Sequence, residues 1–136
     1  MPAFRIAIVA ASFHARETDA MIAEVRRVCA QNGASEAMCV LTPGAMEMPL
    51  ALKRALRRSD VDAAVALGII EKGETLHGAV MGEAVIRAVI GLQLEYMKPI
   101  GTGILGPGIS ADQVQARVVP YARAAAEAAI HMLHHT

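Results

Sequence analysis

The side chains best suited to chemistry come together in one short stretch, Gly73-Glu74-Thr75-Leu76-His77. A hydrophobic run precedes this stretch and a long apolar helical pattern follows it, which predicts a strand end, a turn and a helix start. Backbone N–H groups at a helix start lack intrahelical partners and lie at the positive end of the helix dipole, where a phosphate or another anion binds well. His77 adds a group that exchanges protons near neutral pH. The alternative interpretation is that Gly73 only closes a turn and His77 is an ordinary helix-start residue.

Three further side chains could bind a ligand, and each also has a plain structural explanation. Phe13 is one of only two phenylalanines. Its ring could stack on the flat ring of a ligand, or it could pack beneath its own loop as part of the core. Glu47 comes just before a predicted helix, where its carboxylate could accept hydrogen bonds from ligand hydroxyls or cap the helix. Arg117, in the last predicted helix, could bind a phosphate or form a surface salt bridge. Considered alone, each residue is compatible with both interpretations.

The histidines and cysteines do not form a recognisable metal-binding pattern. His14 could line the same pocket as Phe13, whereas His131, His134 and His135 crowd the C-terminus, where a solvated helix end explains them better than a metal. No spacing of His, Cys, Asp and Glu matches a structural zinc site. The sequence also lacks a Walker loop, a G-x-G-x-x-G fingerprint and a serine nucleophile elbow.

Alternating strands and helices must position these side chains. Four strands are predicted, at residues 5–11, 36–41, 63–70 and 100–105. The first is a short, nearly unbroken apolar run, which is typical of a strand buried on both faces of a parallel sheet. Helical patterns follow the four strands, from Thr18 to Asn32-Gly33, from about Pro49, from Gly78 to about residue 96, and from the capping box Ser110-x-x-Gln113. The third helical pattern is apolar nearly all round, which a short chain can bury only against a neighbouring subunit.

Two sites of irregular backbone are expected near the C-terminus. Gly106-Pro107-Gly108 should turn the chain after the last strand. Pro120 should kink the last helix or delay its regular part, because proline lacks a backbone N–H and clashes with the preceding turn.

The order of elements predicts an α/β fold, a three-layer α/β/α sandwich with a four-stranded parallel sheet and flavodoxin-like topology. Ligands in such sheets bind beyond the C-terminal ends of the strands. The segments expected there are residues 12–14, 42–47, 69–77 and 102–108. No internal repeat or linker is present, so we expect one domain over residues 1–136.

Composition narrows the class of protein. Hydrophobic residues make up 54% of the 136 residues, and this much apolar surface on a small chain predicts a tight oligomer. The formal net charge is zero, which argues against nucleic-acid binding. Cys29 and Cys39 are expected to be small buried residues in a reducing compartment. No apolar run reaches the ~20 residues of a membrane helix and no signal-peptide pattern is present, so we expect a cytoplasmic protein.

Several blocks of sequence together resemble one known family. The blocks are Ser12-Phe13, Pro43-Gly44-Ala45-Met46-Glu47-Met48-Pro49, Leu67-Gly68-Ile69-Ile70 and Gly73-Glu74-Thr75-x-His77. In this order and spacing they resemble the 6,7-dimethyl-8-ribityllumazine synthases. Residues 103–108, with Gln115-Ala116-Arg117 after them, look like the archaeal-type branch, so that the resemblance covers essentially the whole chain.

The resemblance implies a transferase of the penultimate step of riboflavin biosynthesis. The family condenses 5-amino-6-(D-ribitylamino)uracil with 3,4-dihydroxy-2-butanone 4-phosphate, with loss of phosphate and water, and uses no metal or organic cofactor. Its active sites lie between adjacent subunits of a pentamer, and some members assemble twelve pentamers into an icosahedral shell. This agrees with the apolar excess of the present chain.

The resemblance also implies a role for each site residue. The pyrimidine ring would stack on Phe13 and be bordered by the backbone of Ile69, Ile70 and Glu71. The ribityl pocket would be lined by Ala45, Met46 and Glu47, with the Glu47 carboxylate accepting hydrogen bonds from the ribityl hydroxyls. Glu74 and Thr75 would offer backbone amides, and Thr75 its hydroxyl, to the phosphate. Arg117 would be the cation beside that phosphate, and His77 would transfer protons.

The chain departs from the family pattern at several positions. Gly78 stands where many relatives have an aromatic residue, and Thr102, at the far side of the pocket, where many have a bulky apolar residue. Lys72 stands where bacterial relatives often have arginine. Arg123 is a candidate for a second phosphate-binding cation.

Two alternative functions remain compatible with the residues. One is an archaeal-type riboflavin synthase, which joins two lumazine molecules on a related fold. The other is a non-catalytic shell protein that binds lumazine or flavin and would not require His77 or Arg117. A flavodoxin-like binding module is a weaker interpretation, because no flavin phosphate loop follows the first predicted strand.

Overall fold

A computed structural model describes residues 3–71, 76–109 and 111–135, with the side chains of Phe13, Glu71, residues 107–109 and Ala111 outside the description. Its strands are β1 (Arg5–Ala11), β2 (Ser35–Thr42), β3 (Ala63–Glu71) and β4 (Ile100–Ile109). They form one parallel sheet in the order β2-β1-β3-β4. The helices are α1 (Ala15–Gln31), α2 (Met48–Leu56), α3 (His77–Tyr96) and α4 (Ala111–His134), with short 3-10 helices at Ser12–His14 and Ala45–Glu47.

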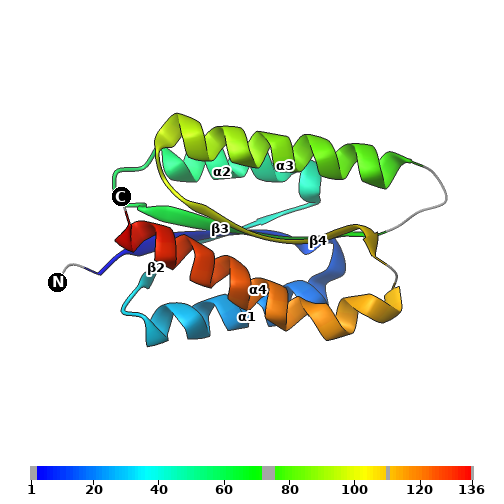
Figure 1. Ribbon diagram of the computed structural model, residues 1–136, viewed down its shortest axis with the longest axis horizontal. Coiled ribbons are helices and arrows are strands. Elements are labelled where there is room, and N and C mark those ends of the chain that lie inside the picture. The colour runs from blue at the N-terminus through cyan, green and yellow to red at the C-terminus, as the bar shows by residue number, and fades with distance from the viewer. Residues whose placement is uncertain (1–2, 72–75, 110, 136) are drawn as a thin grey trace.

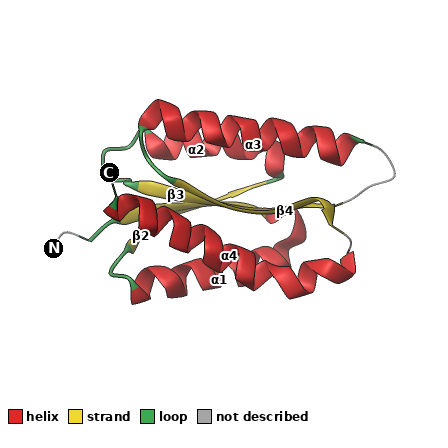
Figure 2. Cartoon of the chain, in the orientation of Figure 1, coloured by secondary structure: helices red, strands yellow, loops and turns green. Residues whose placement is uncertain are grey.

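The helices cover both faces of the sheet. Helices α2 and α3 lie over one face, and α1 and α4 lie over the other (Figure 1). Figure 2 shows the sheet as the middle of three layers. The predicted three-layer α/β/α fold with flavodoxin-like topology is therefore confirmed.

The central strands are apolar on both faces because both faces are covered. All residues from Ile6 to Ala11 and from Ala63 to Ile70 are buried, whereas most of β2, at the edge of the sheet, is only partly buried. The core has two halves. Ile8, Leu67 and Leu105 pack against α1 and α4, while Val9, Ala66 and Ile104 pack against α2 and α3.

Helix α4 approaches β4 closely, and small residues make this possible. A Cβ atom at Gly101 would lie 1.9 Å from the carbonyl oxygen of Ala125, so no larger residue fits there without movement of the backbone. Ala122, Ala125, Ala126 and Ala129 are all buried in the same half of the core. The alanine-rich sequence of α4 thus serves close packing of helix on sheet.

The expected turn at Gly106-Pro107-Gly108 is wrong, because β4 continues through these residues to Ile109. The ladder with β3 changes register there, from Ile69 opposite Leu105 to Glu71 opposite Ile109. Gly106 has a φ of +98°, and a Cβ atom on it would lie 1.9 Å from the carbonyl oxygen of Ile70. The glycine therefore permits a bulge within a strand instead of a turn after it.

The helix boundaries also differ in places from the predictions. Helix α1 begins at Ala15, directly after a 3-10 turn, and not at Thr18. Pro120 lies inside α4, which begins at Ala111, so its regular part is not delayed. Pro49 lies at the start of α2, as predicted. The capping residue Ser110 lies outside the described residues.

Both cysteines are free thiols, as expected, with Cys29 buried and Cys39 partly buried. Burial raises the pKa of each thiol. None of the helices in the described part of the chain is long and apolar enough to cross a membrane.

Candidate functional site

Most of the predicted site residues lie near the point where two adjacent strands send their chains to opposite faces of the sheet. After β1 the chain passes to α1 on one face, and after its neighbour β3 it reaches α3 on the other (Figure 1). Loops that diverge in this way at the C-terminal edge of a parallel sheet leave room for a ligand between them. The segments that follow β1, β2 and β3 carry most of the predicted site residues.

The loop after β2 presents Glu47 to solvent. Glu47 precedes α2 at the N-cap position, but its side chain makes no capping hydrogen bond. A Cβ atom placed on Gly44 would lie 3.3 Å from Oε1 of Glu47, so the Glu47 carboxylate lies against this glycine. The helix-capping interpretation of Glu47 is therefore wrong in this structure, and the carboxylate is exposed and available to a ligand.

Apolar residues form the base of the same edge. Ala45, Ile69 and Ile70 are buried, whereas Met46 has an exposed fraction of 57%. Gly68 brings three elements together, since a Cβ atom on it would meet Ala11 of β1 at 3.4 Å and Met48 of α2 at 3.5 Å. The candidate ring and ribityl contacts, Ala45, Met46, Ile69 and Ile70, thus lie at the ends of neighbouring elements.

His77 is the first residue of α3, and its side chain is exposed. At the start of the helix, the N–H of Val80 donates to the carbonyl oxygen of Leu76 (3.0 Å). The predicted position of His77 at a helix start is therefore confirmed, and anion binding at this helix start stays a prediction. The predicted phosphate contacts Glu74 and Thr75, together with Lys72, lie outside the described residues, as do the side chains of Phe13 and Glu71.

The two arginines that were candidates for phosphate binding differ in their ion pairs. Arg117 is exposed on α4 and forms no ion pair with any residue that the structure describes, so the salt-bridge interpretation finds no partner. Arg123 instead donates to Glu24 of α1, with 2.7 Å between Nε and Oε2. Arg27 donates to both oxygens of the same carboxylate, from Nε to Oε1 at 2.7 Å and from Nη2 to Oε2 at 2.6 Å. The structure thus uses Arg123 to join α4 to α1, which argues against a role as second phosphate cation.

Thr102 lies away from the other site residues of its own chain. It pairs with Ala66 in the sheet, three positions before Leu105 and Ile69 at the C-terminal edge. At about 3.3 Å per residue, this places Thr102 about 10 Å from that edge. Its side chain is exposed beside α3, on the outer strand β4.

Sequence reasoning missed three hydroxyl groups that shape the strand ends. The Ser12 hydroxyl donates to the carbonyl oxygen of Thr42 (3.0 Å), and the Thr42 hydroxyl donates to that of Gly44 (2.8 Å). The Thr18 hydroxyl donates to the carbonyl oxygen of Ala11 (2.8 Å). Serine and threonine next to turn residues often bond nearby backbone, and that signal was present at Thr42-Pro43-Gly44.

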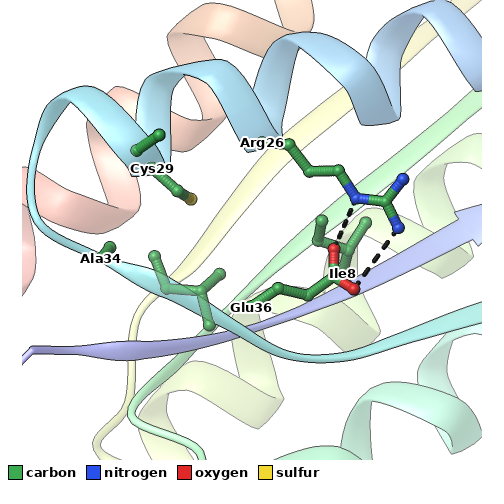
Figure 3. A pocket seen from close by; sticks show the side chains of 7 residues that line it. Ile8, Arg26, Cys29, Ala34 and Glu36 are labelled. Atoms are coloured by element: carbon green, nitrogen blue, oxygen red, sulfur yellow. Dashed lines mark hydrogen bonds and ion pairs between the residues drawn. The ribbon is translucent and has the colours of Figure 1, made fainter.

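A separate hollow lies near the opposite edge of the sheet. It has a volume of about 220 Å³ and is lined by Ile6, Ile8, Arg26, Cys29, Ala30, Ala34 and Glu36. In Figure 3, Arg26 and Glu36 join at one side of the hollow, with 2.6 Å between Nε and Oε1. Residues at the starts of β1 and β2 line it, so this hollow is distinct from the candidate site.

No group of three or more His, Cys, Asp or Glu side chains in the described ranges could hold a metal ion. The C-terminal histidines form ring contacts instead. His131 and His135 lie 4.3 Å apart between ring centroids, and His134 meets the edge of Phe4 at 5.2 Å. The described arrangement offers an exposed histidine, an exposed carboxylate, a helix start and an unpaired arginine, which suit proton transfer and the binding of a polar, anionic ligand.

Comparison with known proteins points to one family. The family model described as 6,7-dimethyl-8-ribityllumazine synthase matches residues 3–136. A Methanopyrus kandleri protein of that name is 38% identical over 133 residues, which cover 98% of this chain and 94% of the relative. One from Saccharolobus islandicus is 34% identical over 97% of this chain and 86% of its own length. One from Metallosphaera sedula is 44% identical over 66% of this chain and 60% of its own length.

Proposed function

The chain belongs to the 6,7-dimethyl-8-ribityllumazine synthase family, and we propose that it is the enzyme that this family name describes. It condenses 5-amino-6-(D-ribitylamino)uracil with 3,4-dihydroxy-2-butanone 4-phosphate to 6,7-dimethyl-8-ribityllumazine, with release of phosphate and water. The observation that carries the proposal is the exposed His77 at the start of α3, beside the point where the loops after β1 and β3 diverge. Two polar features, the exposed Glu47 carboxylate and the start of α3, suit the two substrates.

The pyrimidine substrate binds at the ends of β1, β2 and β3 in this proposal. Its ring stacks on Phe13 and is bordered by Ile69, Ile70 and Glu71. The ribityl chain lies along Ala45, Met46 and Glu47, where the carboxylate accepts hydrogen bonds from its hydroxyls. The exposure of Glu47 and its missing capping bond support this role, because the carboxylate is not already used by the helix.

The phosphate substrate binds at the start of α3. Backbone N–H groups of Glu74 and Thr75, the Thr75 hydroxyl and the Arg117 guanidinium hold its phosphate. The amine of the pyrimidine attacks the ketone carbon, water leaves as the imine forms, and the phosphate departs with the electron pair of its C–O bond. The nitrogen that carries the ribityl chain then attacks the remaining carbonyl carbon, and loss of a second water closes the lumazine ring. Each step moves a proton, and His77 carries it in this proposal, which the exposure of its imidazole supports.

A second copy of the chain completes the active site in this proposal. Thr102 supports it, because this residue lies about 10 Å along β4 from its own chain's ligand edge. Apolar side chains on α2 and α3 support it as well, since Leu50, Val80, Ile90 and Leu94 have exposed fractions of 55%, 65%, 51% and 72%. A hollow of about 390 Å³ between α2 and α3, lined in part by Leu50 and Leu92, could receive side chains of a neighbouring subunit. We propose a pentamer or a multiple of it.

Two further features of the proposal concern the chain as a whole. Residues 1–136 act as one domain, which the match of the family model to residues 3–136 supports. The enzyme works in the cytoplasm, which agrees with two free thiols in the structure.

The proposal is tested by mixing the purified protein with both substrates and following the lumazine chromophore. A reaction without enzyme is the necessary control, because the condensation can proceed slowly unaided. A clear acceleration is expected. A protein that binds the ribityl-pyrimidine without accelerating the reaction would instead be a binding protein, and formation of riboflavin from lumazine alone would identify a riboflavin synthase.

A further inference from the structure

We propose that Thr42, assisted by Ser12, is a positioning residue that holds the Glu47 carboxylate where it binds the ribityl chain. This inference rests on the proposed function and adds a determinant of affinity for one of the two substrates. Its basis is a continuous series of contacts from the end of β1, through Thr42 and Gly44, to the carboxylate of Glu47.

The first contact ties two strand ends together. The β1–β2 ladder ends with Ala11 opposite Thr42. Ser12 directly follows β1 and belongs to a 3-10 turn. Its hydroxyl donates to the carbonyl oxygen of Thr42 at 3.0 Å. A side chain therefore adds one more link between the strands where the backbone of β1 has left the sheet. The loop that contains Phe13 and the loop that leads to Glu47 start from this shared point.

The second contact sets the backbone beneath Glu47. The Thr42 side chain is buried, with an exposed fraction of 5%, and its hydroxyl donates to the carbonyl oxygen of Gly44 at 2.8 Å. Gly44 has an extended backbone, with φ −153° and ψ −174°. A buried side-chain bond to a loop carbonyl restricts the rotation of that peptide, so Thr42 determines how the loop enters the 3-10 turn of Ala45–Glu47.

The third contact connects the loop to the carboxylate. Oε1 of Glu47 would be only 3.3 Å from a Cβ atom on Gly44, so the side chain lies against the glycine. Glu47 has no capping bond to hold it otherwise. Its position therefore depends on the loop that Thr42 holds. Because the ribityl hydroxyls do not react, their contacts with Glu47 contribute equally to the bound substrate and the transition state. Such contacts alter KM and leave kcat unchanged.

The test compares Thr42→Val, which keeps the shape of the side chain but removes the hydroxyl, with Thr42→Ser, which keeps the hydroxyl. Thr42→Val is expected to raise the KM for the ribityl-pyrimidine by about 5- to 30-fold, the usual effect of losing one buried hydrogen bond. We expect kcat and the KM for the butanone phosphate to change by less than about threefold. Thr42→Ser should restore the pyrimidine KM to within about threefold of the original.

Gln93→Met is the matched control for a general loss of stability. Gln93 Oε1 accepts a hydrogen bond from the backbone N–H of Ile100 at 2.9 Å, so this variant also loses one side-chain bond to the backbone, at the opposite edge of the sheet. Its pyrimidine KM should stay unchanged at a comparable unfolding midpoint. The inference is overturned if Gln93→Met raises this KM as much as Thr42→Val does, if both substrates lose affinity equally, or if serine fails to rescue.

A binding measurement separates this inference from the proposed function. If the wild type binds the ribityl-pyrimidine but does not form lumazine, the proposed activity fails, and the dissociation constants of Thr42→Val and Thr42→Ser still decide the positioning role. A dissociation constant that is raised in Thr42→Val but not in Thr42→Ser supports the positioning role. Equal dissociation constants in the two variants overturn it. If the wild type neither reacts nor binds the pyrimidine, both proposals fall.

Discussion

The two helical layers of this molecule bury their apolar surface to different extents. We call α1 with α4 the closed layer and α2 with α3 the open layer. In the closed layer, Arg123 reaches across to Glu24 and Gln115 to Glu17, and alanines bring α4 close to the sheet. In the open layer, Val80 and Leu94 have exposed fractions of 65% and 72%, on a helix whose opposite side is buried. The closed layer is joined by contacts within the chain, whereas the open layer exposes the apolar surface that the proposed assembly would cover.

The two layers should therefore differ in what a substitution changes. The contacts of the closed layer are internal, so changes there should act mainly on folding. The open layer contains His77, at the start of α3, and exposed apolar residues such as Val80 and Leu94, so changes there should act on catalysis and assembly. The predictions below test this separation.

The largest effect is expected from His77→Ala, at the start of the open layer. Turnover should fall by about 10²- to 10⁴-fold, the usual contribution of a general acid–base group, while binding of the ribityl-pyrimidine persists. Steady-state rates and an equilibrium titration measure the two quantities. His131→Ala, at the exposed end of α4, is the control and should leave the rate unchanged. An unaltered rate in His77→Ala would remove this residue from the mechanism.

Where the closed layer packs on the sheet, at the contact of β4 with α4, Gly101→Ala should destabilise the fold strongly. The added methyl group would lie 1.9 Å from the carbonyl oxygen of Ala125, and backbone cannot move as easily as a side chain. We expect a loss of about 3 kcal/mol in the free energy of unfolding, measured with urea. Gly103→Ala meets its nearest atom, Cδ2 of Leu67, at 3.0 Å and should cost less. Equal losses at both positions would contradict the close-packing argument.

Leu94→Lys should dissociate the assembly without unfolding the chain. A lysine in a buried apolar interface loses its hydration without gaining a partner. We expect the dissociation constant between subunits to rise by about tenfold or more, measured by analytical ultracentrifugation. Met132→Lys is the matched control, because Met132 is an exposed apolar residue of the closed layer, with an exposed fraction of 54%. If Met132→Lys dissociates the protein and Leu94→Lys does not, the two layers have been assigned the wrong way round.

The closed layer should respond to acid through Glu24. Hydrogen bonds from Arg27 and then Arg123 outweigh the effect of burial and lower the pKa of Glu24 from 4.5 to about 2. A carboxyl whose pKa is lower in the folded state stabilises the fold above its unfolded pKa, and this contribution disappears as the pH falls from about 4.5 towards 2. Both arginines are about half exposed, so the contribution should be about 1–2 kcal/mol.

Urea unfolding of the wild type and Glu24→Gln across this pH range measures the contribution. The two proteins should differ most near neutral pH and converge in acid. Asp60→Asn is a control from an exposed pair, since Arg58 lowers the pKa of Asp60 on the protein surface. A constant difference between wild type and Glu24→Gln at all pH values would contradict the assigned shift.

The smallest effect is expected at the end of the open layer. Met97 ends α3 in a left-handed conformation with φ +53°, which costs energy for any residue with a Cβ atom. Its side chain has an exposed fraction of 85%, so little packing is lost on its removal. Met97→Gly should therefore stabilise the fold by about 0.5 kcal/mol, measured as a higher urea midpoint. Met97→Ala is the control and should not stabilise it.

Most of the secondary structure could be predicted because it depends on local spacing. Unbroken apolar runs marked β1 and β3, which are buried on both faces, and the 3.6-residue pattern marked the helices. The prediction failed at Gly106-Pro107-Gly108, where the same residue types suit a turn or a bulge. The neighbouring carbonyl of Ile70 decides between them, and it lies on another strand.

The candidate site was predictable in part for the same reason. Glu47 and His77 could be placed at strand and helix ends from local pattern, and the structure finds both exposed there. The hydroxyl of Ser12 could not be given its partner, because Thr42 is 30 residues away in the sequence. Arg123 was an open candidate for phosphate binding, and its true partner Glu24 is 99 residues distant.

The elements, their order and the edge of the sheet at which the candidate site lies could be read from the sequence, since they follow from periodicity and from the geometry shared by parallel sheets. Which distant groups meet depends on the folded chain. The register of β1 on β2 brings the Ser12 hydroxyl to the carbonyl oxygen of Thr42. The packing of α4 on α1 brings Arg123 into an ion pair with Glu24. A hydrogen bond or ion pair requires contact within a few ångströms, and no local pattern determines such a distance between segments that only folding brings together.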